Sequence, residues 1–223
     1  MFQRLRSAVT GQAKPSFDFQ VISDWADDKG YPLAVGNSGF GIEGKIFGKN
    51  WTLECGASAR PYIKDGELLM KAEIDIDRAV SFICVSRALK ETFESSAYQI
   101  NTNSVETIVE SHDLPLEIRW IATHKETGWD GMPYVFWGRY SIFAANVRHP
   151  RLWLTQPLAL NLISWPEGRG KHDSPFILTV MKGAIEIRMQ HDPADVSRME
   201  HAMMIFNQAY KSALEQFGSD LML

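Results

Sequence analysis

The aromatic segment WDGMPYVFWGRY, residues 129–140, has the residue types best suited to recognising another molecule. It holds five aromatic rings together with an aspartate, two glycines and an arginine. Aromatic rings supply large contact areas, and an arginine beside a tryptophan can form a cation–π contact. The pattern predicts a ligand or partner site that includes Trp129, Asp130, Trp137 and Arg139. Burial of the same rings as a segment that closes the core is the alternative, and the need for apolar area favours it.

A second candidate is the segment ARPYIKDGE, residues 59–67, which interrupts a series of strand patterns. It combines an aromatic ring with side chains of both charges. Loops held on a rigid scaffold often carry binding residues. We therefore add Arg60 and Tyr62 to the predicted ligand or partner site.

Catalytic and metal-binding patterns are weak in this sequence. The segment GNSGFGIEG, residues 36–44, lacks the Lys-Ser/Thr pair and the following helix of a phosphate-binding loop. His191-Asp192 and Glu200-His201 bracket the start of the last predicted helix. The nine residues from Asp192 to His201 make two and a half turns and put those two side chains on opposite faces, so the four residues make a poor metal site. The carboxylates of Glu73, Asp75 and Asp77 favour a solvated strand face. We predict no metal and no cofactor.

The two cysteines, Cys55 and Cys84, form no CxxC pair, and both fall in apolar strand patterns that favour packing over reactivity. No catalytic residue can be named from the sequence, so whether the protein is an enzyme stays open. The enzymatic alternative is a small hydrolase or transferase that uses a carboxylate and a histidine in acid–base chemistry.

Charge and hydropathy narrow the class of protein. The formal net charge is -4 and the isoelectric point is about 5.9, which argues against non-specific nucleic-acid binding. No apolar run approaches the roughly 20 residues that span a bilayer, and the first residues lack the apolar core of a secretory signal. We expect a cytoplasmic protein with no membrane span and no nucleic-acid partner.

Period-two alternation predicts strands grouped in hairpins. Residues 40–55 alternate apolar and polar side chains around a turn at residues 48–50, and residues 68–77 follow the same rule. Residues 176–190 read as two strands joined at Lys182 and Gly183. Residues 80–86 are apolar on both sides, which places them centrally or beneath a helix.

Helical spacing appears before, between and after these strands. We expect helices over residues 16–29, 87–95, 116–124 and 148–166, with Pro157 kinking or starting part of the last. A long helix follows, with Asp192 as N-cap and Gly218 at its end. Its apolar stripe, which steps by three and four residues from Val196 to Phe217, favours docking on a sheet over a two-helix seam between copies.

Together these patterns predict an α+β fold: antiparallel sheet(s) built from hairpins, with flanking helices and a long C-terminal helix packed on the sheet. Residues 1–15 are expected to be a flexible leader and residues 16–223 one domain. Its halves, about 16–100 and 139–223, share a weak pattern of hairpin then helix, without repeated residues. We predict a binding or protein-interaction module that could self-associate as a homodimer.

Overall fold

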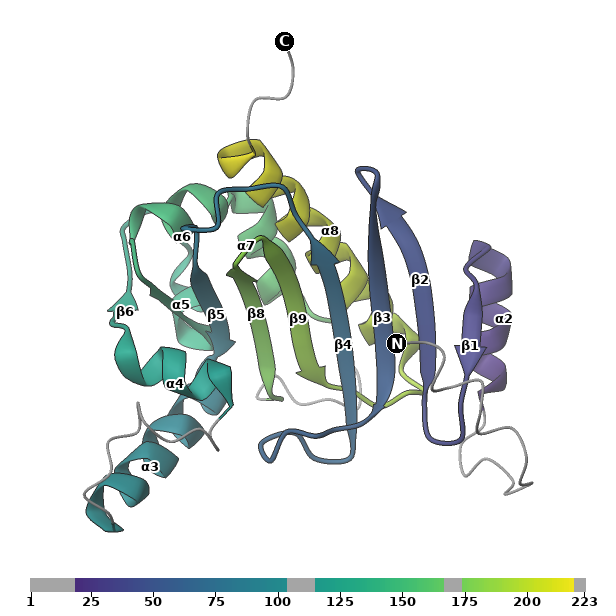
Figure 1. Ribbon diagram of the computed structural model, residues 1–223, viewed down its shortest axis with the longest axis horizontal. Coiled ribbons are helices and arrows are strands. Elements are labelled where there is room, and N and C mark those ends of the chain that lie inside the picture. The colour runs from purple at the N-terminus through teal and green to yellow at the C-terminus, as the bar shows by residue number, and fades with distance from the viewer. Residues whose placement is uncertain (1–18, 104–114, 167–173, 219–223) are drawn as a thin grey trace.

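Nine antiparallel strands form one continuous sheet (Figure 1). The computed structural model describes residues 19–103, 115–166 and 174–218, so the predicted leader, residues 1–15, lies outside the described residues. The sheet order is β1-β2-β3-β4-β9-β8-β5-β7-β6. The strands are β1 (Leu33–Val35), β2 (Phe40–Ile46), β3 (Lys49–Ala57), β4 (Gly66–Glu73), β5 (Phe82–Ser86), β6 (Glu126–Thr127), β7 (Tyr140–Ala144), β8 (Phe176–Met181) and β9 (Ala184–Gln190).

The hairpins form because alternating side chains place one apolar face on each strand pair. In β2–β3, Phe40 lies opposite Cys55 and Ile42 opposite Leu53, and all four side chains are buried. The turn lies at Phe47 and Gly48, which both have a left-handed backbone, with φ of 46° and 80°. It therefore begins one residue earlier than the predicted turn at residues 48–50.

The C-terminal hairpin is inserted into the sheet formed by the earlier strands. β9 pairs with β4 and β8 pairs with β5, so the last two strands separate β4 from β5. This order brings the β3–β4 loop beside the segment that follows β9. The backbone N–H of His191 donates to the carbonyl of Gly66 at 2.9 Å, which fixes that contact.

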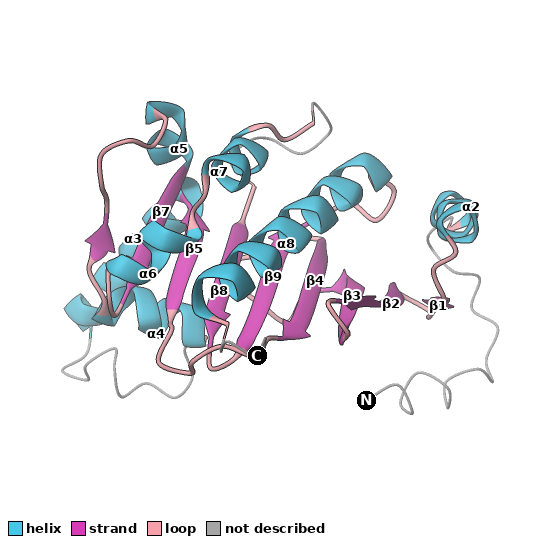
Figure 2. Ribbon diagram, turned by 90° about the horizontal axis from the view of Figure 1, so that it is seen from above, coloured by secondary structure: helices cyan, strands magenta, loops and turns pink. Residues whose placement is uncertain are grey.

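Helices cover the two faces of the sheet unequally (Figure 2). The larger core lies beneath α2, α5, α6, α7 and α8, whereas α3 and α4 cover only the β5–β7 end of the other face. The bounds are α2 (Gln20–Lys29), α3 (Arg87–Asn103), α4 (Leu116–Thr123), α5 (Tyr134–Arg139), α6 (Arg148–Trp153), α7 (Gln156–Ile163) and α8 (Val196–Phe217).

Strand β5 separates the two cores. Phe82 and Cys84 belong to the larger core, and Ile83 and Val85 belong to the smaller one. This confirms the central position predicted for residues 80–86. The α+β arrangement and the C-terminal helix packed on the sheet also agree with the sequence.

The long helix α8 docks on the sheet through the predicted stripe, and Met199, Phe206 and Tyr210 are buried there. Its start differs from the prediction. Asp195, not Asp192, caps the helix, and its carboxylate accepts a hydrogen bond from the backbone N–H of Arg198 at 3.1 Å. The Asp192 carboxylate instead accepts from the backbone N–H of Ala194, closing a turn before the helix. Aspartate is a favourable N-cap residue at either position. The helix begins after Asp195 because the carboxylate of Asp192 is used in the preceding turn.

Candidate functional site

The aromatic segment forms an open hollow beside α5. Trp129 and Trp137 meet edge to face with ring centroids 5.1 Å apart. Together with Asp130 and Tyr134 they line a hollow of about 460 Å³, which we call the α5 hollow. Tyr134 is 89% exposed, whereas Phe136, from the same short helix, is fully buried. One segment thus serves the core with some of its rings and presents others to solvent.

Arg139 does not join this hollow. Its guanidinium donates to the carbonyl of Ile163 at the end of α7, and it is absent from the residues that line the hollow. The predicted arrangement of a ligand held between tryptophan rings and Arg139 is therefore not preformed. Arg139 instead ties α5 to α7.

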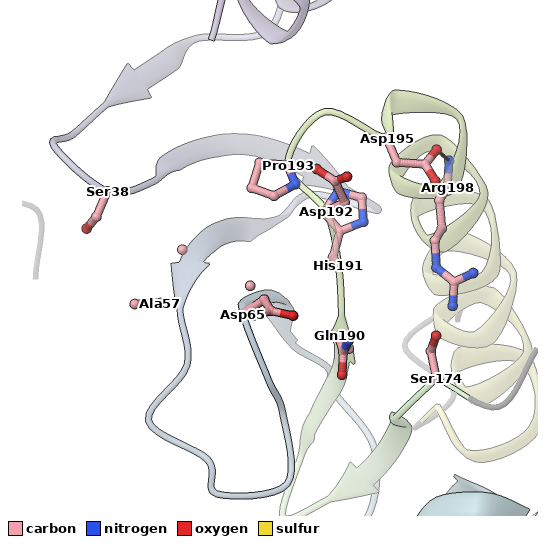
Figure 3. Close-up of a pocket in the computed structure, with 12 residues that line it drawn as sticks. Ser38, Ala57, Asp65, Ser174, Gln190, His191, Asp192, Pro193, Asp195 and Arg198 are labelled. Atoms are coloured by element: carbon pink, nitrogen blue, oxygen red, sulfur yellow. Dashed lines mark hydrogen bonds between the residues drawn. The ribbon is translucent and has the colours of Figure 1, made fainter. Parts of the chain in front are cut away.

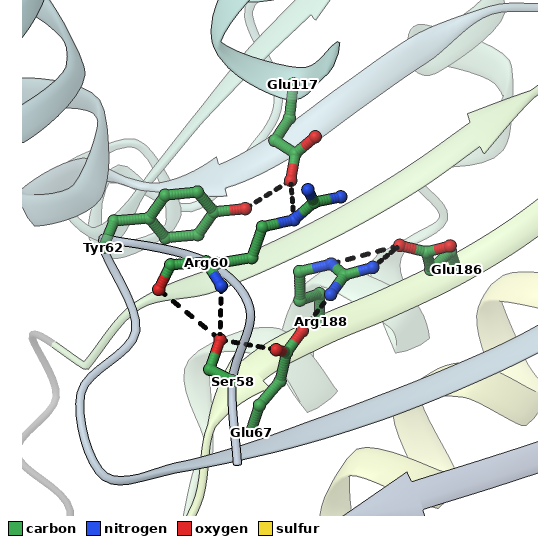
Figure 4. A network of polar contacts seen from close by, with 7 residues as sticks. All are labelled: Ser58, Arg60, Tyr62, Glu67, Glu117, Glu186 and Arg188. Atoms are coloured by element: carbon green, nitrogen blue, oxygen red, sulfur yellow. Dashed lines mark hydrogen bonds and ion pairs between the residues drawn. The ribbon is translucent and has the colours of Figure 1, made fainter. Parts of the chain in front are cut away.

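Arg60 and Tyr62 meet a third residue, Glu117 on α4, on the other face of the sheet (Figure 4). The Tyr62 hydroxyl donates to the Glu117 carboxylate, and Arg60 Nε lies 2.9 Å from Glu117 Oε1. Burial and the neighbouring carboxylate raise the pKa of Tyr62 well above its ordinary value. The three side chains attach the β3–β4 loop to α4.

A second set of ion pairs lies beside this contact. Arg188 on β9 binds Glu67 on β4 and, at 2.9 Å, Glu186 on its own strand. Ser58 donates to Glu67 at 2.6 Å. Because Arg188 and Glu67 have their charged groups satisfied by each other, this network serves to hold the loop and strands together.

A further pocket lies at the start of α8 (Figure 3). We call it the α8 pocket. It has a volume of about 530 Å³, within the range of small-molecule sites. The β3–β4 loop contributes Asp65, the segment from β9 to α8 contributes Gln190 to Asp195, and the first turn of α8 contributes Arg198.

Arg198 is the cation among the described residues that line the α8 pocket. Its side chain is 7% exposed, and its guanidinium lies over the Trp165 ring, 4.9 Å from the centroid. Within the described ranges no carboxylate forms an ion pair with it. Burial lowers the pKa of Arg198, and nearby Asp195 opposes that shift. A buried cation without a direct counter-ion is costly, so this guanidinium is a candidate to receive an anionic group.

His191 adds a buried imidazole to the same wall. The residue is 2% exposed, and neither ring nitrogen has a hydrogen-bond partner in the part of the chain that the structure describes. Burial lowers the pKa of His191 to about 4, so the ring is neutral near pH 7. A base with that pKa accepts protons poorly at neutral pH.

Three carboxylates complete the charge of the α8 pocket. Asp65, Asp192 and Asp195 line the pocket together with one guanidinium, that of Arg198, so with a neutral imidazole these described groups carry a formal charge of -2, from -3 and +1. Asp192 and Asp195 each accept a backbone N–H. Asp65 stands on a left-handed backbone, with φ of 66°. Non-glycine residues in that region are uncommon and recur at functional sites.

The cysteines offer no nucleophile to this pocket. Both are buried, and burial raises the pKa of Cys55 to about 12 and that of Cys84 further. Among the described residues, no group of three histidine, cysteine or carboxylate side chains could hold a metal ion. Nor does any helix in that part of the chain have the length and apolar character needed to cross a membrane.

The sequence indicated parts of this pocket but not the whole. His191 belongs to a weak metal pattern and Asp192 was predicted as a helix cap, and Asp65 lies in the loop that was predicted to bind. Arg198 was missed, although it had a signal. It stands four residues before Ala202 and seven before Ile205, both fully buried, so it falls on an inward face of α8.

Comparison with known proteins gives a distant structural likeness and no family. No protein-family model matches the chain, and no curated protein matches it. The crystal structure of the mycobacterial trehalose monomycolate transport factor A aligns with 87% of this chain and 93% of that chain, at 10% identity and a TM-score of 0.47. A likeness of that degree carries no argument, so the proposals below depend on the residues of this chain.

Proposed function

We propose that this protein is a binding module whose α8 pocket takes a small ligand through an acid group. The observation that carries the proposal is the buried guanidinium of Arg198, which forms no ion pair with any described carboxylate. A ligand carboxylate would supply two acceptor oxygens, the geometry that a guanidinium matches best. Stacking against Trp165 keeps the guanidinium plane in place before a ligand arrives.

Binding fits the α8 pocket better than the hydrolase or transferase alternative. That alternative needs a histidine that exchanges a proton near neutral pH. His191 has a pKa of about 4, and the two thiols are held protonated by burial. Neutral imidazole remains useful for binding, because it can donate one hydrogen bond and accept another.

The test compares the buried Arg198 with the partly buried Arg139. Arg198→Gln removes the guanidinium from the α8 pocket, and Arg139→Gln removes one that lies outside it. Saturation-transfer NMR with hexanoate as the probe detects weak binding in each variant. We expect the Arg198→Gln signal to fall at least about 10-fold and the Arg139→Gln signal to stay, since a charged hydrogen bond contributes about 1.5–3 kcal/mol.

Thermal unfolding of both variants shows whether each still folds. If hexanoate gives no signal with the unmodified protein, or the same signal with folded Arg198→Gln, the proposed acid site is wrong.

A second candidate is the α5 hollow, which is supported by the 89% exposure of Tyr134 beside Trp129 and Trp137. Such rings suit a partner that stacks on them. Tyr134→Ser is the informative variant, because an exposed ring contributes little to folding. Hexanoate binding that falls in Tyr134→Ser and stays in Arg198→Gln would move the site to this hollow.

A further inference from the structure

The described residues that line the α8 pocket carry more negative than positive charge, and this imbalance limits the ligand beyond its acid group. Among the described lining residues, Asp65, Asp192 and Asp195 stand against one guanidinium, that of Arg198. An acid group bound to Arg198 would leave all three carboxylates without a cation. A ligand with a single anionic charge alone would therefore be repelled by its surroundings as well as attracted.

We infer that the ligand also carries an ammonium group, so that the pocket takes zwitterions of the amino-acid class, with the acid on Arg198 and the ammonium on the aspartate side. This inference rests on the proposed function, because it assumes that Arg198 receives the acid group. An ammonium group has three donors and no acceptor, which suits a wall rich in carboxylate oxygens.

Asp65 is the carboxylate best placed for that ammonium. Figure 3 shows its carboxylate directed from the β3–β4 loop into the pocket, on the side away from Arg198. The described residues give it no hydrogen bond or ion pair, whereas Asp192 and Asp195 already accept backbone N–H groups. Its left-handed backbone, with φ of 66°, holds the side chain at this position at some conformational cost.

The groups between Asp65 and Arg198 also suit a polar ligand. Gln190 and His191 lie there (Figure 3), and an amide and a neutral imidazole can each donate and accept. None of the described residues that line the pocket is a phenylalanine, tyrosine or tryptophan, so the described wall lacks the ring platform typical of sugar sites. A doubly charged phosphate would meet three carboxylates for one arginine.

Four six-carbon probes separate the two charges of the ligand. Hexanoate carries the acid alone, hexylammonium the amine alone, and L-norleucine and 6-aminohexanoate carry both at short and long spacing. Titration followed by NMR gives a dissociation constant for each. We expect at least one zwitterion to bind about 10-fold or more tightly than hexanoate, because a second charged contact is added.

Asp65→Asn tests the amine contact, and asparagine tolerates the left-handed backbone equally well. We expect this variant to lose about 10-fold in zwitterion affinity while hexanoate binding holds or improves. Asp130→Asn, in the α5 hollow, is the matched control and should change neither constant.

The outcomes distinguish this inference from the proposed function. Hexanoate binding that depends on Arg198, with zwitterions no tighter and no effect of Asp65→Asn, would overturn the inference and keep the acid site. Loss of every Arg198-dependent signal would overturn both. Binding of hexylammonium alone, unaffected by Arg198→Gln, would make the pocket a site for amines and overturn both as stated.

Discussion

His191 is neutral in the folded protein at a pH where an exposed histidine is already charged. Its folded pKa of about 4 lies below the ordinary value of 6.5, so the unfolded chain binds more protons between these limits. Stability is therefore complete above about pH 6.5 and falls as the pH drops toward 4. A difference of roughly 2.5 pKa units corresponds to about 3 kcal/mol. We expect urea unfolding to show a loss of that order over this range.

The variant His191→Gln separates this effect from the titration of carboxylates. It should lose less free energy of unfolding than the unmodified protein between pH 6.5 and 4. His201 also has a lowered pKa through burial, so some dependence should remain. His124→Gln is the control and should retain the full slope. Equal slopes in His191→Gln and the unmodified protein would show that His191 titrates normally.

Glu117 is the residue on which the β3–β4 loop and α4 depend. It is 7% exposed and binds both Tyr62 and Arg60. Glu117→Gln keeps the shape but leaves the half-buried Arg60 without its counter-ion. We expect the free energy of unfolding to fall by about 1–3 kcal/mol, measured by urea denaturation at pH 7.

Glu91→Gln, at an exposed position of α3, is the comparison for Glu117→Gln and should change stability by less than about 0.5 kcal/mol. Similar values for the two variants would mean that the contacts of Glu117 are replaced by water without loss.

Residue chemistry could be predicted only where it depends on neighbours in sequence. The burial of Cys55 followed from alternation in its strand, and that of Cys84 from a strand that is apolar on both sides. The contact of Arg60 and Tyr62 with Glu117 could not, because it joins residues 55 or more positions apart. The α8 pocket likewise depends on the insertion of β9 beside β4, which no local pattern specifies.

At the scale of elements, the β8–β9 hairpin offers a test of turn geometry. Lys182 and Gly183 both have a left-handed backbone, with φ of 55° and 74°. This is the two-residue turn that favours asparagine followed by glycine. Lys182→Asn should stabilise the protein by about 0.5–1 kcal/mol. Gly183→Ala should destabilise it by about 1–2 kcal/mol, because alanine is strained there.

Thermal unfolding of the two variants measures both signs. A rise for Gly183→Ala, or a fall for Lys182→Asn, would mean that the turn changes its conformation to suit the new residue. Gly128→Ala is the control, since its backbone is not left-handed and an added methyl group meets open space.

The positions of elements with a strong hydrophobic periodicity were predicted well. Which helix face is buried, and at which residue a helix begins, were predicted less well. The strands of both hairpins appear where alternation placed them. In α2, however, Ile22 and Ala26 face the core, whereas Val21, one residue before Ile22, is 53% exposed. A short helix buries a narrow face, and rotation by one residue is decided by partners from distant strands. The N-cap of α8 is Asp195 and not the predicted Asp192, because Asp192 forms a turn that precedes the helix.

At the scale of the whole molecule, the edge strands of the sheet are shorter and less buried than its central strands. β1 and β6 have three and two residues and pair on one side only, whereas β5 is buried on both faces. Amide hydrogen exchange should therefore be slowest in β5, β8 and β9 and fast in β1 and β6. Central amides should exchange only through opening close to global unfolding, and edge amides through local fraying.

The same experiment bears on self-association, which the sequence predicts and which no contact of the described residues tests. A homodimer that pairs its edge strands would protect the amides of Leu33 to Val35, and a homodimer formed elsewhere would leave them fast. Sedimentation velocity over a range of concentrations measures the association itself. We expect a species heavier than the 25.3 kDa chain at high concentration. A monomer at every concentration, with β1 unprotected, would rule out the homodimer and leave the α8 pocket as a site within a single copy.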